Sequence, residues 1–368
     1  MGSARWGLAV TVAATGLAVA TSGAGIASAG PRAAHPSTPT SRAARPEAGN
    51  PNGHVPVPPG GGAVDTSHPN HVIGRGTPGS CTSAAVVKAV AKGGVITFNC
   101  GPRPVTIVMT ATAKLWNTEH RVVLDGGGTV ALSGGGKRRI LYKNTCDRSR
   151  VWTTDHCNDQ PWPYLILQHI TLEDGNSQVR QTPTSNYGGG AIFDLGGRLK
   201  VVDTTFLDNR CYRVGPDLGG AAIRALEQFH NRPVFITNDT FRGGRCSNGS
   251  ALSSIGVSWV VTNSLFVNNR AIGHGANPAP HGSPGGGSGG AIYMDGDLMT
   301  LLVQGTSMSD NHAKEGGGAI FFVSDDNSGS ATISHSTLHD NPSLGFQTQP
   351  GIFYQSGPRL KVIKSTIS

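Results

Sequence analysis

The sequence predicts an all-β protein, a right-handed, single-stranded parallel β-helix in which short strands stack as the coils of a solenoid. A strand pattern recurs through the second half of the chain, its copies are unequally spaced, and two cysteines stand at equivalent positions in neighbouring copies. Repeats of one supersecondary unit predict a stacked architecture, because no unit can bury its apolar face alone.

Each copy of the repeat begins with a Gly-rich entry and a short apolar strand. A turn, a β-branched strand, a Ser/Thr–apolar pair and a polar turn with Asn follow. The copies are GGGAIFDLGGRLKVVDTTFLDN (188–209), GGAAIRALEQFHNRPVFITNDTFRGG (219–244), GSALSSIGVSWVVTNSLFVNN (249–269), GGAIYMDGDLMTLLVQGTSMSDN (289–311), GGGAIFFVSDDNSGSATISHSTLHDN (316–341) and the shorter GIFYQSGPRLKVIKSTIS (351–368).

The spacing of the copies favours a β-solenoid over a helical repeat. Marker residues of the Ser/Thr–apolar pair lie 25 residues apart at Phe241 and Phe266, but 42 apart at Phe266 and Met308. Extra residues can leave a β-coil as loops, whereas helical repeats must keep their length to pack. Five residues before the markers, the pattern predicts an inward column of Leu167, Val201, Ile236, Val261, Val303, Ile333 and Val362.

The six cysteines predict three disulfides. Cys211 and Cys246 each stand five residues after a marker, so we expect them on adjacent coils, about 4.8 Å apart. Cys146 and Cys157 are expected to close a polar loop between them. Cys81 and Cys100 flank an Ala/Val/Lys-rich segment, which predicts an α-helix that caps the N-terminal end of the solenoid.

The N-terminus has the pattern of a secretory signal peptide, residues 1–29, with a cleavage site after Ala29. Residues 30–70 are rich in Pro, Ala, Ser and Gly without apolar periodicity, which predicts a flexible tether. The β-helix domain is expected over residues 71–368, with no transmembrane segment after signal cleavage.

The charge pattern argues against a nucleic-acid partner. The formal net charge is +8 and the pI is about 9.4, but the basic residues are scattered and form no recognised binding motif. For a secreted chain at the cell wall or outside the cell, we expect attraction to anionic polymers instead.

The GGAI strand entries, followed by strands that end in Asn-containing turns, resemble the repeats of polymorphic outer-membrane proteins and, more widely, the pectate-lyase-like β-helix superfamily. The resemblance covers about residues 75–368. It implies a secreted protein that binds or processes extracellular polysaccharide, as a lyase or a glycoside hydrolase if it is an enzyme. The alternative is a non-enzymatic, adhesin-like surface solenoid. The aspartate motifs of polygalacturonases and the arginine signature of pectate lyases are absent from the sequence.

Strand alternation predicts an outward ridge that binds sugar rings. If Ile192 and its equivalents point inward, the next residues point outward, namely Phe193, Arg224, Ser253, Tyr293, Phe321 and Phe353. We predict that Phe193, Tyr293, Phe321 and Phe353 bind substrate. The preceding alanines, 191, 222, 251, 291 and 319, are expected to floor an open trough beside them. Loops folded over this face would instead make the rings ordinary core.

Arg224, Asp295 and Glu315 are the predicted catalytic residues, chosen among several carboxylates near the ridge. In a lyase, Arg224 would act as the base or hold a uronate carboxylate, with Ca²⁺ bound by nearby aspartates; in a hydrolase, Asp295 and Glu315 would form the acid–base pair. His169 and His335 share one repeat position with Asp203, Asn238 and Asn263, and this column is expected to be a polar bend.

Overall fold

The computed structural model describes residues 45–178, 188–216, 218–275 and 285–368. The expected signal peptide and the first part of the expected tether lie outside these residues. In the described part, every pairing between the numbered strands is parallel, and most strands fall into three long sheets, A, B and C.

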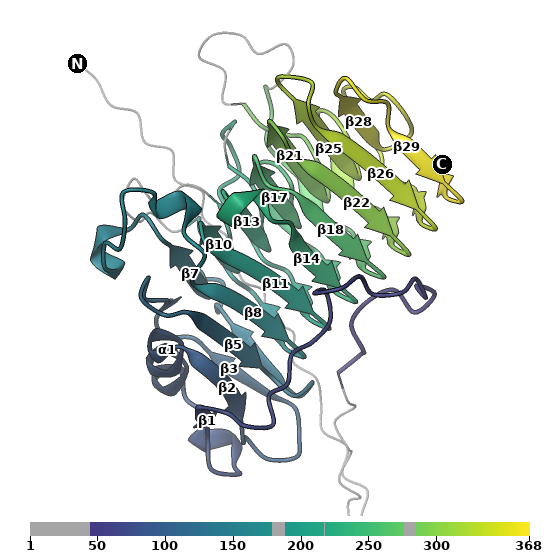
Figure 1. The fold of residues 1–368 in the computed structure, drawn as a ribbon. Helices are drawn as coiled ribbons and strands as arrows, with labels where there is room; N and C mark the ends of the chain where they lie inside the picture. The colour runs from purple at the N-terminus through teal and green to yellow at the C-terminus, as the bar shows by residue number, and fades with distance from the viewer. Residues whose placement is uncertain (1–44, 179–187, 217, 276–284) are drawn as a thin grey trace, which may run out of the picture. The chain divides into compact units, whose positions relative to one another are not determined.

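Sheet A has ten strands in the described part (Figure 1). In order, they are β1 (His71–Ile73), β2 (Gly94–Phe98), β5 (Arg121–Asp125), β8 (Tyr164–Gln168), β11 (Arg198–Val202), β14 (Val234–Thr237), β18 (Trp259–Thr262), β22 (Thr300–Gln304), β26 (Ser330–Ser334) and β29 (Lys361–Ile363).

Sheet B consists of β3 (Val105–Val108), β6 (Val130–Ser133), β9 (Thr171–Glu173), β12 (Thr205–Leu207), β15 (Thr240–Arg242), β19 (Leu265–Val267), β23 (Ser307–Ser309), β27 (Thr337–His339) and β30 (Thr366–Ile367). Sheet C consists of β4 (Ala113–Lys114), β7 (Leu141–Asn144), β10 (Ile192–Leu195), β13 (Ile223–Leu226), β17 (Leu252–Ile255), β21 (Ile292–Gly296), β25 (Ile320–Ser324) and β28 (Ile352–Gln355). A short fourth sheet joins β16 (Arg245–Cys246), β20 (Arg270–Ala271) and β24 (His312–Ala313).

From β2 onward, the chain visits the three long sheets in the fixed order A, B, C and then returns to A one coil further on. Each strand therefore pairs with its equivalent in the next coil, which is the arrangement of a parallel β-solenoid. Long crossover connections are unnecessary here because the other two faces of the coil return the chain.

The predicted inward columns match the observed register. Val201, Ile236 and Val261 are aligned in sheet A, and Phe206, Phe241 and Phe266 are aligned in sheet B. The three phenyl rings stack 4.8 and 4.7 Å apart between centroids and are at most 1% exposed. Together with Ile192 and its equivalents they form one core that continues from coil to coil.

The alanine column differs from the expectation. Ala191, Ala222, Ala251, Ala291 and Ala319 are at most 3% exposed and belong to the apolar core. They stand where the chain enters sheet C, and this bend directs the alanine and the following Ile or Leu into the interior. A small side chain fits here, so the column does not floor an open trough.

All three predicted disulfides are present, Cys81–Cys100, Cys146–Cys157 and Cys211–Cys246. The last joins neighbouring coils, with a Cα separation of 4.7 Å. The helix expected between Cys81 and Cys100 is α1 (Ser83–Lys92), whose first turn is capped by the Thr82 side chain. Its apolar face packs against β1, β2 and β4.

Residues 45–70 form an extended segment that we call the N-terminal strap, drawn in purple in Figure 1. The composition assigned this stretch to a flexible tether, and that expectation needs correction here. The strap is held to successive coils, from Asn50 N on the Asn263 carbonyl (2.8 Å) to Val64 N on Gln168 Oε1 (2.9 Å). Side-chain and backbone hydrogen bonds order it, so it needs no apolar periodicity.

An ion pair lies inside the coils, where apolar side chains are usual. Lys143 Nζ is 2.8 Å from Asp194 Oδ1, and both side chains are fully buried. Lys143 also donates to the Arg198 carbonyl (2.7 Å), and Gln228 donates to Asp194 Oδ2 (2.7 Å). Burial lowers the pKa of Lys143 and raises that of Asp194, while their mutual attraction opposes both shifts. Asp194 is therefore a core residue and does not face the outer ridge.

The buried pair predicts a non-additive effect on stability. Lys143→Met or Asp194→Leu alone leaves a buried charge without its partner, so each should lower the free energy of unfolding by about 3–5 kcal/mol. The double variant should lose distinctly less, because it removes both charges. Urea unfolding of the four proteins measures this, and additive losses would contradict the pairing.

Candidate functional site

From β8 onward, each coil passes from sheet A to sheet B through one residue with positive φ. His169 and Asp203 have φ of 48°, and Asn238 and Asn263 have 55° and 49°. Asn and Asp tolerate this conformation better than other residues with a Cβ. The polar bend expected at these positions is present, and it brings His169 and Asp203 of neighbouring coils together.

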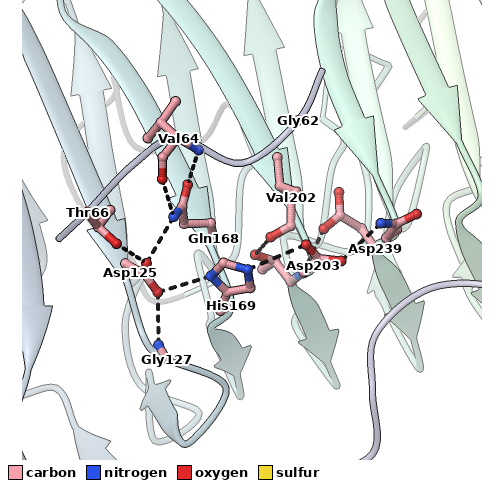
Figure 2. A network of polar contacts seen from close by, with 12 residues as sticks. Gly62, Val64, Thr66, Asp125, Gly127, Gln168, His169, Val202, Asp203 and Asp239 are labelled. Atoms are coloured by element: carbon pink, nitrogen blue, oxygen red, sulfur yellow. Dashed lines mark hydrogen bonds and ion pairs between the residues drawn. The ribbon is translucent and has the colours of Figure 1, made fainter. Parts of the chain in front are cut away.

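His169 lies between two carboxylates (Figure 2). Its Nδ1 is 3.1 Å from Asp125 Oδ1, and its Nε2 is 3.5 Å from Asp203 Oδ2. Asp125 ends β5, and the two bend residues follow β8 and β11. The His169 side chain is 38% exposed and that of Asp203 36%, whereas Asp125 is nearly buried. Each ring nitrogen of His169 therefore faces a carboxylate oxygen.

Asp125 is kept ionised by its neighbours. Burial on its own would raise the pKa of this carboxyl, but hydrogen bonds from Thr66, Gly127 and Gln168 and the charge of His169 outweigh it, so the pKa lies below the usual value. Thr66 Oγ1 donates to Oδ2 (2.7 Å), and Gly127 N donates to Oδ1 (2.9 Å). Thr66 belongs to the strap, so the same carboxylate holds the strap and His169.

Asp203 has a polar contact on its other side. The Asn238 side chain donates to Asp203 Oδ1 at 3.0 Å. Behind it, the buried Asp239 accepts backbone amides from Thr204 (2.7 Å) and Thr237 (2.9 Å). Burial raises the pKa of Asp239 well above its usual value, and the nearby negative charge of Asp203 contributes to the rise. The two aspartates therefore differ in exposure, because the Asp203 side chain reaches the surface whereas Asp239 is buried.

His169 and Asp203 line a groove between the strap and the outer face of sheet B. Two hollows, of about 390 and 750 Å³, share the strap residues 45–48 as one wall. Thr171 and Thr205 line both hollows, and the larger continues past Thr240 to Leu265. We call this the strap groove. The smaller hollow is lined about equally by polar and apolar atoms and the larger one mainly by apolar atoms, and the lining extends over β9, β12, β15 and β19 of successive coils.

Strap residue Arg45 lines both hollows of the strap groove. Its Nη2 donates to Thr106 Oγ1 (2.9 Å), and its Nη1 is 3.6 Å from Glu173 Oε2. The groove therefore offers a cation, a carboxylate and an imidazole within one surface. Such a set can bind a polar chain and move protons at it.

The predicted sugar-binding ridge is buried in its first part. Phe193 and Arg224 are each 1% exposed. Phe193 stacks with Tyr142 at 5.6 Å, and the Arg139 guanidinium lies 5.2 Å above its ring. Arg139 also donates to the carbonyls of Gly188 and Gly189, which brings the strand entry over this face. This part of the ridge is therefore not an open surface.

Tyr293, Phe321 and Phe353 are half-buried, and their rings stack on one another. The centroids of Tyr293 and Phe321 are 4.9 Å apart with an interplanar angle of 1°, and those of Phe321 and Phe353 are 5.2 Å apart. Phe346 packs edge-on against Phe353. Ring faces between neighbours are occupied within the stack, which leaves mainly edges for a ligand.

The three predicted catalytic residues make separate contacts. Arg224, on β13, donates to Ser253 Oγ at 2.5 Å. Asp295, on β21, accepts from the Tyr293 hydroxyl at 2.9 Å, and it lies two residues further along the strand direction than the column of Arg224. Glu315 follows β24 and accepts from Gly275 N at 2.9 Å.

The strap groove was missed from sequence because its parts are far apart in the chain. His169 and Asp203 occupy the same column of the repeat, so the sequence alone indicates that they lie on neighbouring coils. Asp125 precedes the recurrent copies, and Thr66 stands in a stretch without periodicity. Their assembly depends on the path of the strap, which local patterns do not encode.

Neither a metal cluster nor a membrane helix is found in the described residues. No group of three or more His, Cys, Asp or Glu side chains there is arranged to hold a metal ion, so calcium binding stays a prediction. None of the helices in the same ranges has the length and apolarity needed to cross a bilayer. No family model, curated protein or solved structure matches the chain.

The lowered pKa of Asp125 predicts acid-dependent stability. A carboxyl whose pKa is lower in the folded than in the unfolded protein stabilises the fold above its unfolded value, near 3.8, and loses this contribution as the pH falls through the folded value. At pH 7, Asp125→Asn should therefore reduce the free energy of unfolding, by about 1–3 kcal/mol.

Urea unfolding of wild type and Asp125→Asn at several pH values checks this expectation. The difference between the two proteins should shrink below about pH 4, where the wild-type carboxyl becomes protonated. A difference that persists unchanged at pH 2.5 would show that the carboxylate charge is not what holds this network.

Proposed function

We propose that this protein is a secreted right-handed β-helix that binds or processes an extracellular polysaccharide, and that the strap groove is its site of action. The proposal includes a fold of the pectate-lyase-like type, with α1 as its N-terminal cap. Three disulfides support an oxidising compartment. The single observation that carries the proposed activity is the imidazole of His169 between Asp125 and Asp203 at the groove wall.

The groove suits a polymer because it runs across successive coils. Threonines of equivalent strands, Thr171, Thr205 and Thr240, repeat along its floor, and strands of neighbouring coils are about 4.8 Å apart. The Thr240 hydroxyl accepts Gly49 N of the strap at 2.9 Å, so the half-buried Thr205 is the member of this column that is best placed to hydrogen-bond to a sugar unit. Arg45 and Arg242 line the larger hollow and can pair with carboxylates of a uronate chain.

His169 and Asp203 provide the acid–base chemistry in this proposal. In lyase chemistry, Asp203 would remove the ring proton beside the uronate carboxylate, the bond from the neighbouring carbon to the glycosidic oxygen would break to leave a double bond, and His169 would protonate the leaving oxygen. In hydrolysis, the pair would act as one base: Asp203 would take a proton from the attacking water and share it with His169 across their 3.5 Å contact. A second acid would then have to protonate the leaving oxygen, because groups this close cannot flank a glycosidic bond. Asp125 positions His169 in either case.

The second candidate is a non-enzymatic, adhesin-like surface solenoid. The stacked rings of Tyr293, Phe321 and Phe353 favour it, because rings that occupy one another's faces stabilise the coils and present little stacking surface. Arg224, Asp295 and Glu315 stay candidate catalytic residues on that side of the molecule. A variant comparison separates the two proposed sites.

A polymer screen tests the proposal. Purified protein is incubated with neutral and anionic polysaccharides, with and without calcium, and new reducing ends and unsaturated products are measured. We expect product from at least one polymer, and His169→Gln should reduce the rate by about 10²–10⁴-fold, as loss of a general acid–base group does. Asp203→Asn should have an effect of similar size.

Arg224→Gln and Glu315→Gln serve as the comparison set, and circular dichroism confirms folding of every variant. If the His169→Gln variant still forms product and the Glu315→Gln variant does not, the active site lies on the sheet C face and not in the strap groove. Absence of product and of binding for every polymer would favour the structural solenoid.

A further inference from the structure

A rigid loop projects from the coil that contains β7. The Cys146–Cys157 disulfide closes it, and Asp147 accepts Ser149 N (2.9 Å) at the start of the short helix η2 (Arg148–Arg150). Asn117 anchors the middle of the loop, since its side-chain amide donates to the carbonyls of Thr145 and Val151, both at 3.0 Å. This loop is thus fixed by covalent and polar contacts at several points.

The loop and its neighbours carry stacked arginine–aromatic pairs. The Arg150 guanidinium lies 4.4 Å from the centroid of Trp116, and that of Arg148 lies 4.6 Å from Trp152. On the next coils, Arg198 lies 4.1 Å above the ring of Tyr164. We call these six residues the arginine–aromatic strip. Arg148 and Trp152 are exposed, and Trp116 is half-buried.

Backbone strain sits at the centre of the loop. Val151, between Arg150 and Trp152, has φ of 74°, which is rare for a β-branched residue. Such strain persists only where the surroundings impose it, and it is concentrated at functional sites. Here it directs Arg150 and Trp152 toward different stacking partners.

Positive charge accumulates beside the strip. The pKa of Lys200 is lowered first by burial and then by the nearby positive charges of Arg198 and Arg121. Lys200 donates to the strap carbonyls of Gly60 and Gly62, at 3.2 and 2.6 Å, and not to a carboxylate. Lys200 itself is buried, so the cations that this edge of sheet A presents beside the aromatic rings are the exposed Arg121 and the half-buried Arg198.

We propose that the arginine–aromatic strip is a second binding site, specific for an anionic polysaccharide. Guanidinium groups bind carboxylates or sulfates, and aromatic rings pack on the apolar faces of sugar rings. Tyr164 begins β8 and Gln168 ends it beside the strap groove, so the two sites lie about 13–17 Å apart along the strand. That the ligand is a polysaccharide rests on the proposed function. The strip adds that this polysaccharide is anionic and that it is also bound at a point outside the strap groove.

Binding measurements on the full chain test the strip. Immobilised polygalacturonate, its carboxyl-reduced neutral form and single-stranded DNA are compared at low and moderate salt. We expect wild type to prefer polygalacturonate, and Arg148→Gln/Arg150→Gln to bind it at least about tenfold more weakly with a smaller salt dependence. Trp152→Ala should weaken binding without changing the salt dependence. Arg148→Lys/Arg150→Lys should recover only part of the affinity, because lysine keeps the charge but not the planar stack.

The matched control is Arg75→Gln/Arg103→Gln, which removes the same charge from exposed positions that follow β1 and β2, beyond the opposite ends of the sheet A strands from the strip. Equal losses in both double variants, no binding by wild type, or a preference for DNA would each overturn the strip as a polysaccharide site. Product formation tests the proposed function separately from binding. His169→Gln should form no product but still bind polygalacturonate. If wild type binds polygalacturonate and forms no product, the strip stands as a binding site and processing in the strap groove is rejected.

Discussion

The bend from sheet A to sheet B is the constraint on which the rest of the molecule depends. From β8 onward, each coil turns at one residue with positive φ, and this residue is His, Asp or Asn in five of the seven coils. Because the coils stack in register, these side chains form a polar column along the outside of the solenoid. The strap is bound to this column at Asn263 and, one residue before the bend, at Gln168. A structural requirement of the backbone thus creates the wall of the strap groove.

Two surfaces follow from the same geometry at opposite ends of the sheet A strands. At the ends of the strands, the bend column and the strap enclose His169 and Asp203. At the starts, the arginine–aromatic pairs line the entry from sheet C, with the disulfide-closed loop above them. The bend column places polar residues on successive coils, and the strip joins loop residues to the paired starts of β8 and β11. Both surfaces therefore extend over several coils, which suits an extended ligand more than a single small molecule.

The fold could be read from the sequence because its main determinants recur at fixed positions within each copy. The Phe206, Phe241 and Phe266 column and the Cys211–Cys246 disulfide both follow from that register. Exposure was harder to predict. Phe193 alternates as an outward residue should, yet Arg139 and the Gly188–Gly189 entry cover it. The strap was taken for a tether because hydrogen bonds to the bend column leave no periodic signal, and the strap groove was missed with it.

Hydrogen–deuterium exchange with a bound oligosaccharide locates the ligand without a mutation. We expect added protection in residues 45–51 and around His169 and Asp203 when a polymer fragment occupies the strap groove. We also expect little change in the strands that carry Tyr293, Phe321 and Phe353. Protection confined to those strands, with unchanged exchange in the strap, would contradict the assignment of the groove as the site of action.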